Sequence, residues 1–128
     1  MRILIDTHAF LWAAADDPKL SPHARALLQD GSNDVYLSAA SAWEIAIKYK
    51  TGRLPIDRAP RDYVLSRSAF LQLTPLDVNY AHAFCVADLP PIHADPFDRM
   101  LVAQAIVERM PILTDDSHIG RYDVEVIW

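Results

Sequence analysis

The sequence is poor in the residues that crosslink a fold or hold a soft metal. Its single cysteine, Cys85, cannot form an internal disulfide, and a small residue suits the helical stretch AHAFCVADL around it. We expect Cys85 to be a core residue and not a nucleophile. The five histidines form no HExxH motif and no two-ligand helical spacing, and no cysteines are paired, which argues against a structural zinc site.

Long apolar runs, linkers and internal repeats are also absent. The apolar start, MRILIDTHAFLWAAADD, is interrupted by Asp6 and His8 well short of a secretion signal or a membrane span. With 52% hydrophobic and 23% charged residues, the composition is that of an ordinary globular protein. We expect one domain over residues 1–128, in the cytoplasm and with no membrane partner.

Positive charge is in deficit, with a formal net charge of −5. This argues against a protein that holds nucleic acid mainly through many Lys and Arg contacts to phosphate. The deficit is uneven, because six basic side chains face two acidic ones between residues 48 and 67, a local charge of +4 that leaves −9 on the rest. The basic segment either steers a polyanion toward an acidic pocket or is only a solvated helix face.

Alternating apolar runs and helix-capping residues predict an α/β fold. Short connections favour a parallel sheet covered on both faces. Thr7 is the expected cap of the first helix, and either Ser38 or Ser41 opens the third. The expected strands are 2–5, 35–37, 70–73, 112–114 and 124–128, and the expected helices are 8–14, 21–29, a third ending at Gly52, 61–69, a fifth from Pro75 or Asp77 to Pro90, and 97–110.

Acidic residues lie where the chain is expected to leave a strand or enter a helix. They are Asp6 in ILIDTHAF, Glu44 in SAWEIAIK, Asp98 in DPFDRML, and Asp115 with Asp116 in ILTDDSH. In an open α/β sheet, ligands bind beyond the carboxyl ends of the strands, so these carboxylates can converge on one crevice. Convergent carboxylates repel each other unless a cation lies between them, and Mg²⁺ or Mn²⁺ prefers oxygen ligands.

Each acid also has a structural explanation. Asp6 follows a wholly apolar run, where a charge is costly unless it is hydrogen-bonded or neutralised, and with Thr7 available as the cap we favour a functional role. Glu44 fits a capping box opened by Ser41 as well as it fits a site. Asp98 either complements the helix dipole or points into the crevice.

Other residues near these acids are assigned to structure. Asp95 is the expected N-cap before Pro96, and one of the two aspartates in TDDS can be a simple turn residue. His93 can approach the pocket but is given no catalytic role, and neither is His8. The tryptophans lie in apolar stretches and are expected in the core or an interface, at Trp12, Trp43 and Trp128.

The motifs LIDTHAFLW, SAASAWEIAIKYKTGRL, HADPFDRMLVAQA and ILTDDSHI resemble those of the PIN-domain nucleases, specifically the VapC-type toxins of bacterial toxin–antitoxin modules. The resemblance runs nearly end to end. It implies a PIN-like three-layer α/β/α sandwich with a five-stranded parallel sheet. It also implies Mg²⁺- or Mn²⁺-dependent endoribonuclease activity on RNA, a homodimer, and inhibition by a cognate antitoxin protein.

Carried onto matching positions, the resemblance implies that the catalytic acids are Asp6, Glu44, Asp98 and Asp116, with Asp6 and Asp98 as metal ligands. A non-catalytic PIN-like binding domain with a vestigial acidic pocket is the main alternative. A phosphatase of the haloacid-dehalogenase type is a weak one, because it needs a second acid two residues after the first, where this chain has His8. A phosphoacceptor receiver domain is also a weak alternative, because it needs a basic residue just after a late strand to contact the phosphoryl group, and this sequence offers none there.

Overall fold

The computed structural model describes residues 1–128 and contains one sheet of five parallel strands. The strands lie in the order β3-β2-β1-β4-β5, which confirms the predicted five-stranded parallel sheet. Their bounds are β1 (Arg2–Ile5), β2 (Asp34–Ser38), β3 (Thr74–Leu76), β4 (Ile112–Leu113) and β5 (Val126–Ile127). The helices are α1 (Thr7–Ala14), α2 (Pro22–Gln29), α3 (Ala39–Lys50), α4 (Pro60–Phe70), α5 (Tyr80–Asp88), α6 (Pro96–Glu108) and the 3₁₀ turn η1 (Ile119–Arg121).

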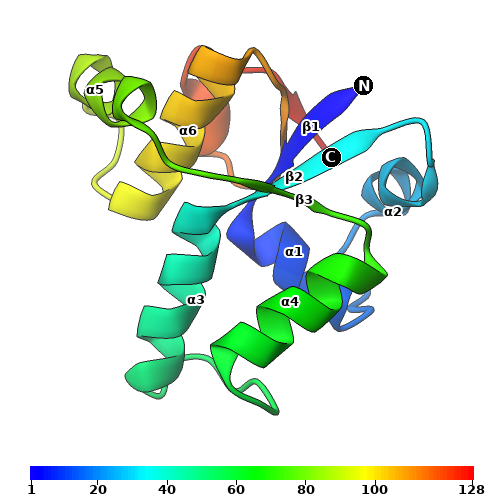
Figure 1. The fold of residues 1–128 in the computed structure, drawn as a ribbon. Coiled ribbons are helices and arrows are strands. Elements are labelled where there is room, and N and C mark those ends of the chain that lie inside the picture. The colour runs from blue at the N-terminus through cyan, green and yellow to red at the C-terminus, as the bar shows by residue number, and fades with distance from the viewer.

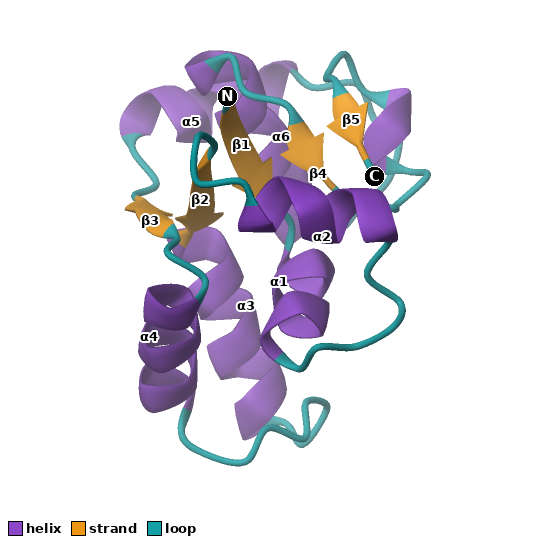
Figure 2. Ribbon diagram, turned by 90° about the vertical axis from the view of Figure 1, so that its right-hand side faces the viewer, coloured by secondary structure: helices purple, strands orange, loops and turns teal.

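Helices cover both faces of the sheet, as the alternation of side chains along a strand requires (Figure 1). Ile3 and Ile5 of β1 point into a cluster built with α1, α2, α3 and α4. Leu4, between them, points into a second cluster built mainly with α6 and η1. A quarter turn of the molecule shows α1, α2 and α4 away from α5 and α6, with the strands between (Figure 2). The fold is therefore the expected three-layer α/β/α sandwich.

The third strand was predicted in the wrong place. Phe70 ends α4 and is largely exposed, and β3 follows at Thr74–Leu76 with Pro75 inside it. Proline cannot donate to a strand ladder, but β3 is the edge of the sheet and pairs only with β2, where a proline is tolerated. The next helix accordingly starts at Tyr80 and not at the predicted Pro75 or Asp77.

Two local features bear on the earlier expectations. Cys85 lies half-buried on α5, where burial raises the pKa of its thiol, so it suits packing better than nucleophilic attack. No helix is both long and apolar enough to cross a membrane.

Candidate active site

The acids gather at a reversal in the order of the strands. After β1, the chain adds β2 and β3 on one side of it and then crosses to add β4 and β5 on its other side. Loops leaving β1 and β4 therefore diverge at their carboxyl ends, which is where open α/β sheets bind ligands. Asp6 directly follows β1, and Thr114 directly follows β4.

Asp6 is the N-cap of α1, so the prediction that Thr7 would cap this helix is wrong. Its Oδ1 accepts a 2.6 Å hydrogen bond from the backbone N–H of Ala9, and its Oδ2 accepts from the hydroxyl of Thr114. Thr7 lies inside the helix and donates instead to Ser41 on α3, at 2.9 Å. Capping and a role in the site are therefore compatible, because each uses a different oxygen of Asp6.

Burial disfavours the ionised form of the Asp6 carboxyl. Only 4% of the residue is exposed, and this desolvation raises the pKa of Asp6 to about 6 despite its hydrogen bonds from Thr114 and Ala9. The negative charge of Asp115 raises it further. A carboxylate held at such a position gains more from a nearby cation than a solvated one does.

Glu44 points inward from the second turn of α3. The helix opens at Ser38, whose hydroxyl accepts from the N–H of Ala40, so the alternative capping box with Ser41 does not form. The Oε2 of Glu44 accepts a 2.6 Å hydrogen bond from Lys48, but its Oε1 is buried and has no hydrogen-bond partner. A buried carboxylate oxygen without a donor is costly, which makes Oε1 a candidate position for a ligand or water.

Asp98 lies in the first turn of α6, behind the N-cap Asp95. As predicted, Asp95 is structural, because its Oδ1 accepts from the N–H groups of Phe97 and Asp98, at 2.9 and 3.0 Å. Desolvation raises the pKa of Asp98 to about 6, and the charges of Asp95, Asp116 and Glu44 add to the rise. Asp98 is therefore close enough to Asp116 and Glu44 for their charges to act on it.

Asp116 and Asp115 occupy different positions after β4. Asp116 is half-buried, its N–H donates to Thr114 at 3.0 Å, and its Oδ1 accepts from the N–H of His118 at 2.8 Å. Asp115 is exposed, but its charge acts on Asp6, whereas that of Asp116 acts on Asp98. Each aspartate is therefore near a different acid, and Asp116 is the more constrained of the two.

Thr114 links the separated acids. Its hydroxyl donates to Asp6 and accepts from the backbone of Asp116, so it ties the end of β1 to the loop after β4. The side chains as they stand do not yet form a coordination sphere, because no three of the His, Cys, Asp and Glu groups are placed to hold one ion. The candidate acidic pocket is therefore defined by contacts and charge influences between pairs of acids, and one of its carboxylate oxygens, Glu44 Oε1, has no partner.

Residues to which the sequence analysis gave no role in the site lie beside Asp98. His93 Nε2 is 3.4 Å from Asp98 Oδ2, and His93 Nδ1 is 2.8 Å from the hydroxyl of Tyr122. Arg99 donates to the same hydroxyl at 3.1 Å. Only the proximity of His93 to the aspartate in HADPFD was visible in the sequence. The contact with Tyr122 spans 29 residues and requires the folded chain.

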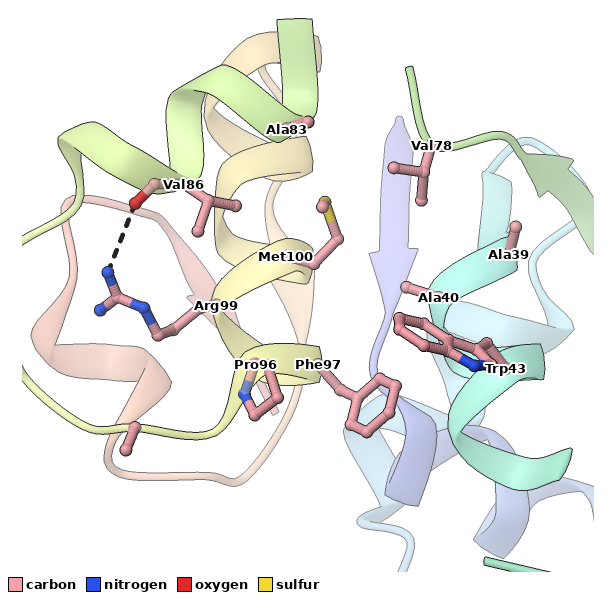
Figure 3. Close-up of a pocket in the computed structure, with 11 residues that line it drawn as sticks. Ala39, Ala40, Trp43, Val78, Ala83, Val86, Pro96, Phe97, Arg99 and Met100 are labelled. Atoms are coloured by element: carbon pink, nitrogen blue, oxygen red, sulfur yellow. Dashed lines mark hydrogen bonds between the residues drawn. The ribbon is translucent and has the colours of Figure 1, made fainter. Parts of the chain in front are cut away.

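An apolar cleft of about 560 Å³ adjoins the acids between α3 and the α5–α6 pair. Trp43 and Phe97 meet edge to face across it, with ring centroids 5.1 Å apart, and each directly precedes an acid of the pocket (Figure 3). Trp43 is 63% exposed, so it is not a core residue. Figure 3 also shows Arg99 reaching the carbonyl of Val86, away from the cleft.

A three-layer parallel fold with carboxylates at the strand-order reversal defines an acidic-pocket α/β protein, and comparison with known proteins gives its family. The family model described as "PIN domain" matches residues 3–125. The chain belongs to the PIN-domain family, as its motifs indicated.

Individual relatives agree with this assignment. Over 69 residues the chain is 45% identical to Ribonuclease VapC16 of Mycobacterium tuberculosis, and this match spans 51% of the chain and about half (49%) of that relative. VapBC2 from Rickettsia felis, bound to a DNA fragment from its promoter, superposes with a TM-score of 0.72 at 16% identity, covering 100% of this chain and 99% of the other. FitAcB from Neisseria gonorrhoeae superposes with a TM-score of 0.64 at 20% sequence identity, covering 98% of this chain and 96% of the other. These two structures show the shared fold.

Proposed function

We propose that this protein is a metal-dependent endoribonuclease that hydrolyses RNA phosphodiester bonds and acts as the toxin of a toxin–antitoxin pair. The observation that carries the proposal is the buried, desolvated Asp6 at the strand-order reversal, which Thr114 ties to the loop of Asp116. Asp98 in turn lies within reach of the charges of Asp116 and Glu44. The family assignment and the similarity to a relative named as a ribonuclease support it.

The donor set suits Mg²⁺ or Mn²⁺. Every candidate ligand is a carboxylate oxygen, and the free Oε1 of Glu44 is a buried acceptor that an ion or its water would satisfy. Asp6 and Asp98 would hold the ion, Asp116 would support it directly or through water, and Glu44 would complete the shell or orient the attacking water. When bound, the ion supplies an activated water and positive charge for the phosphate oxygens.

The protein's own groups prepare this pocket. Thr114 and the N–H of Ala9 hold the two oxygens of Asp6, while Lys48 holds one oxygen of Glu44 and leaves the other free. These partners restrain Asp6 and one oxygen of Glu44, and the other carboxylates would turn toward the ion when it binds. Single-stranded RNA loops are the expected substrate, since their bases can be splayed away from the backbone.

Cleavage of a synthetic single-stranded RNA by purified protein in Mg²⁺ tests the proposal. Asp6→Asn and Asp98→Asn should each abolish cleavage, while Asp57→Asn, at an exposed and distant site, should cleave at the wild-type rate. Comparing the single variants Asp115→Asn and Asp116→Asn decides which aspartate serves the site. We expect Asp116→Asn to lose more of the cleavage rate. Wild-type rates for Asp6→Asn or Asp98→Asn would refute the assignment.

The proposed antitoxin would cover the first helices. A groove of about 670 Å³ lies between α1, α2 and α4, with the apolar side chains Leu20, Leu28 and Leu71 in its lining. Phe70, 76% exposed, also lines it, and the Nε of Arg67 there is buried without an acceptor. An antitoxin segment that buries Phe70 would cover apolar surface, and a basic side chain of the antitoxin would reach the carboxylates and displace the metal.

Phe70→Glu tests this interface. It should weaken binding of the cognate antitoxin in calorimetry while RNA cleavage by the free protein stays unchanged. Leu65→Glu, at an exposed position outside the groove lining, is the matched control. An antitoxin complex whose contacts lie far from Asp6, and which still cleaves RNA, would contradict the proposal.

A second copy of the chain is the proposed partner at a separate surface, on α3 and α5. Large aromatic side chains stay exposed there, Trp43 on α3 and the stacked pair Tyr80 and Phe84 on α5. Tyr, Trp and Phe are enriched in protein interfaces. Light scattering should give a dimer for the wild type and a monomer for Phe84→Glu, with Leu65→Glu still dimeric. A monomeric wild type would refute the homodimer.

The alternative is a non-catalytic PIN-like binding domain with a vestigial acidic pocket. One observation favours it, namely that no three candidate ligands are already placed around one ion. Calorimetric titration with Mn²⁺ separates the two functions, because an inert pocket should show no binding that Asp6→Asn abolishes. Binding that depends on both Asp6 and Asp98 would favour the enzyme.

A further inference from the structure

Two histidines outside the predicted site stack on each other and each contacts one of its acids. The rings of His93 and His118 are nearly parallel, with an interplanar angle of 6° and centroids 5.3 Å apart. His93 Nε2 lies 3.4 Å from Asp98 Oδ2, and His118 Nδ1 lies 3.3 Å from Asp116 Oδ1. The stack therefore connects the N-terminus of α6 to the loop after β4 directly beside the pocket.

The donor and the acceptor of the hydrogen bond at Nδ1 of His93 can be assigned. Arg99 can only donate, so the oxygen of Tyr122 accepts from its Nη1 at 3.1 Å. The Tyr122 hydroxyl then has its own proton to donate, and His93 Nδ1 at 2.8 Å is the acceptor in reach. A neutral imidazole that accepts at Nδ1 carries its proton on Nε2, the atom that faces Asp98.

We propose that His93 is a positioning residue for Asp98, set in its Nε2–H tautomer by the donor chain from Arg99 through Tyr122. The inference rests on the proposed metal site. His93 holds Oδ2 of Asp98, while Oδ1 accepts no hydrogen bond from the protein and is left for a divalent cation. Partners that orient a ligating carboxylate in this way commonly change metal affinity when they are removed.

The hydrogen bond from His93 counteracts the repulsion between Asp98 and the neighbouring acids. Asp98 lies among like charges, since Asp95, Asp116 and Glu44 all disfavour its ionised form. Without a donor on Oδ2, the carboxylate would rotate away from these neighbours toward solvent. The surroundings of His93 restrain its ring, because His118 stacks on one face and the buried Tyr122 ring lies 5.5 Å away at 57°.

Nitrogen-15 NMR of histidine-labelled protein, without metal at neutral pH, tests the hydrogen-bond direction. The spectrum should show the proton of His93 on Nε2 alone. Tyr122→Phe keeps the buried ring but removes the hydroxyl, and should release His93 into a mixture of tautomers. A proton on Nδ1 of His93 in the wild type, or a tautomer unaffected by Tyr122→Phe, would overturn the proposed chain.

Titration with Mn²⁺ alone tests the positioning role without any RNA. His93→Ala should weaken Mn²⁺ binding by roughly 10–100-fold. His93→Gln, whose amide can still donate to Asp98, should stay within about threefold of the wild type. His23→Ala, at an exposed histidine on α2, is the matched control.

The possible failures are distinguishable. If His93→Ala binds Mn²⁺ as tightly as the wild type while Asp98→Asn does not bind, the positioning role is wrong and the metal site stands. If the wild type binds no Mn²⁺, the proposed function fails, and with it the role of His93 toward a metal. Equal losses for His93→Gln and His93→Ala would also refute the hydrogen-bond role, because the conservative variant keeps the donor.

Discussion

Replacing Asp6 by asparagine should make the protein more stable at neutral pH while it removes the proposed activity. The pKa of Asp6 rises from 3.8 to about 6 because the carboxyl is buried. At about 1.4 kcal/mol per pKa unit, ionising this group in the folded protein costs about 3 kcal/mol. Asparagine carries no charge, caps helices as well as aspartate, and can keep the Oδ1 bond from Ala9.

The sign of the pH dependence follows from the direction of the shift. The folded state binds the proton more tightly than the unfolded state, so this stabilisation is complete below about pH 4 and is lost as the pH rises through about 6. Loss of the Thr114 hydrogen bond costs the variant about 1 kcal/mol at every pH. Asp6→Asn should therefore be slightly less stable than the wild type at pH 4 and about 2 kcal/mol more stable at pH 7.5.

Urea unfolding of both proteins in a metal chelator, at pH 4 and pH 7.5, measures this difference. Subtracting one protein from the other cancels the other titrating groups, and we expect the difference to change by about 2–3 kcal/mol between the two pH values. Adding Mn²⁺ at pH 7.5 should stabilise only the wild type. A difference that does not depend on pH would refute the claim that Asp6 is held as a costly anion.

Three further predictions concern the supporting structure. Lys48→Met should lower the free energy of unfolding by about 1–3 kcal/mol, because it leaves both oxygens of the buried Glu44 without a donor. A loss below about 0.5 kcal/mol, which is typical of exposed ion pairs on a helix, would contradict this. Ser38→Ala should cost about 1 kcal/mol by removing the cap of α3, as measured by thermal unfolding with Ser32→Ala as the control, and equal losses in both variants would argue against a capping role. Leu101→Ala should cost about 2–5 kcal/mol in urea unfolding, since the side chain is fully buried in the α6 cluster, and a loss under about 1 kcal/mol would mean that this core is loosely packed.

Sequence patterns predicted the parts of the fold that local chemistry determines. The strand at Arg2–Ile5 and the Ser21–Pro22 helix start were correct because an apolar run and a cap with proline act locally. The third strand was misplaced because the apolar stretch at Phe70 belongs to a helix end. Pro75 was read as a helix start, and only the sheet order shows that it lies on an edge strand.

The acids of the candidate site could be proposed from the sequence, but the contacts between them could not. The acids could be named from the sequence because they follow predicted strands or open helices. Thr114 could not, because its bond to Asp6 joins residues 108 positions apart. The capping-box alternative for Glu44 was excluded only when the structure placed the helix start at Ser38, three residues before Ser41.

Anomalous scattering from crystals grown with Mn²⁺ tests most directly whether the separated acids share a divalent ion. The proposed site predicts one or more Mn²⁺ peaks within coordination distance of both Asp6 and Asp98, with Glu44 and Asp116 reaching it directly or through water. A fully occupied peak elsewhere on the surface, or no peak in this pocket at a Mn²⁺ concentration that supports RNA cleavage, would contradict the proposal.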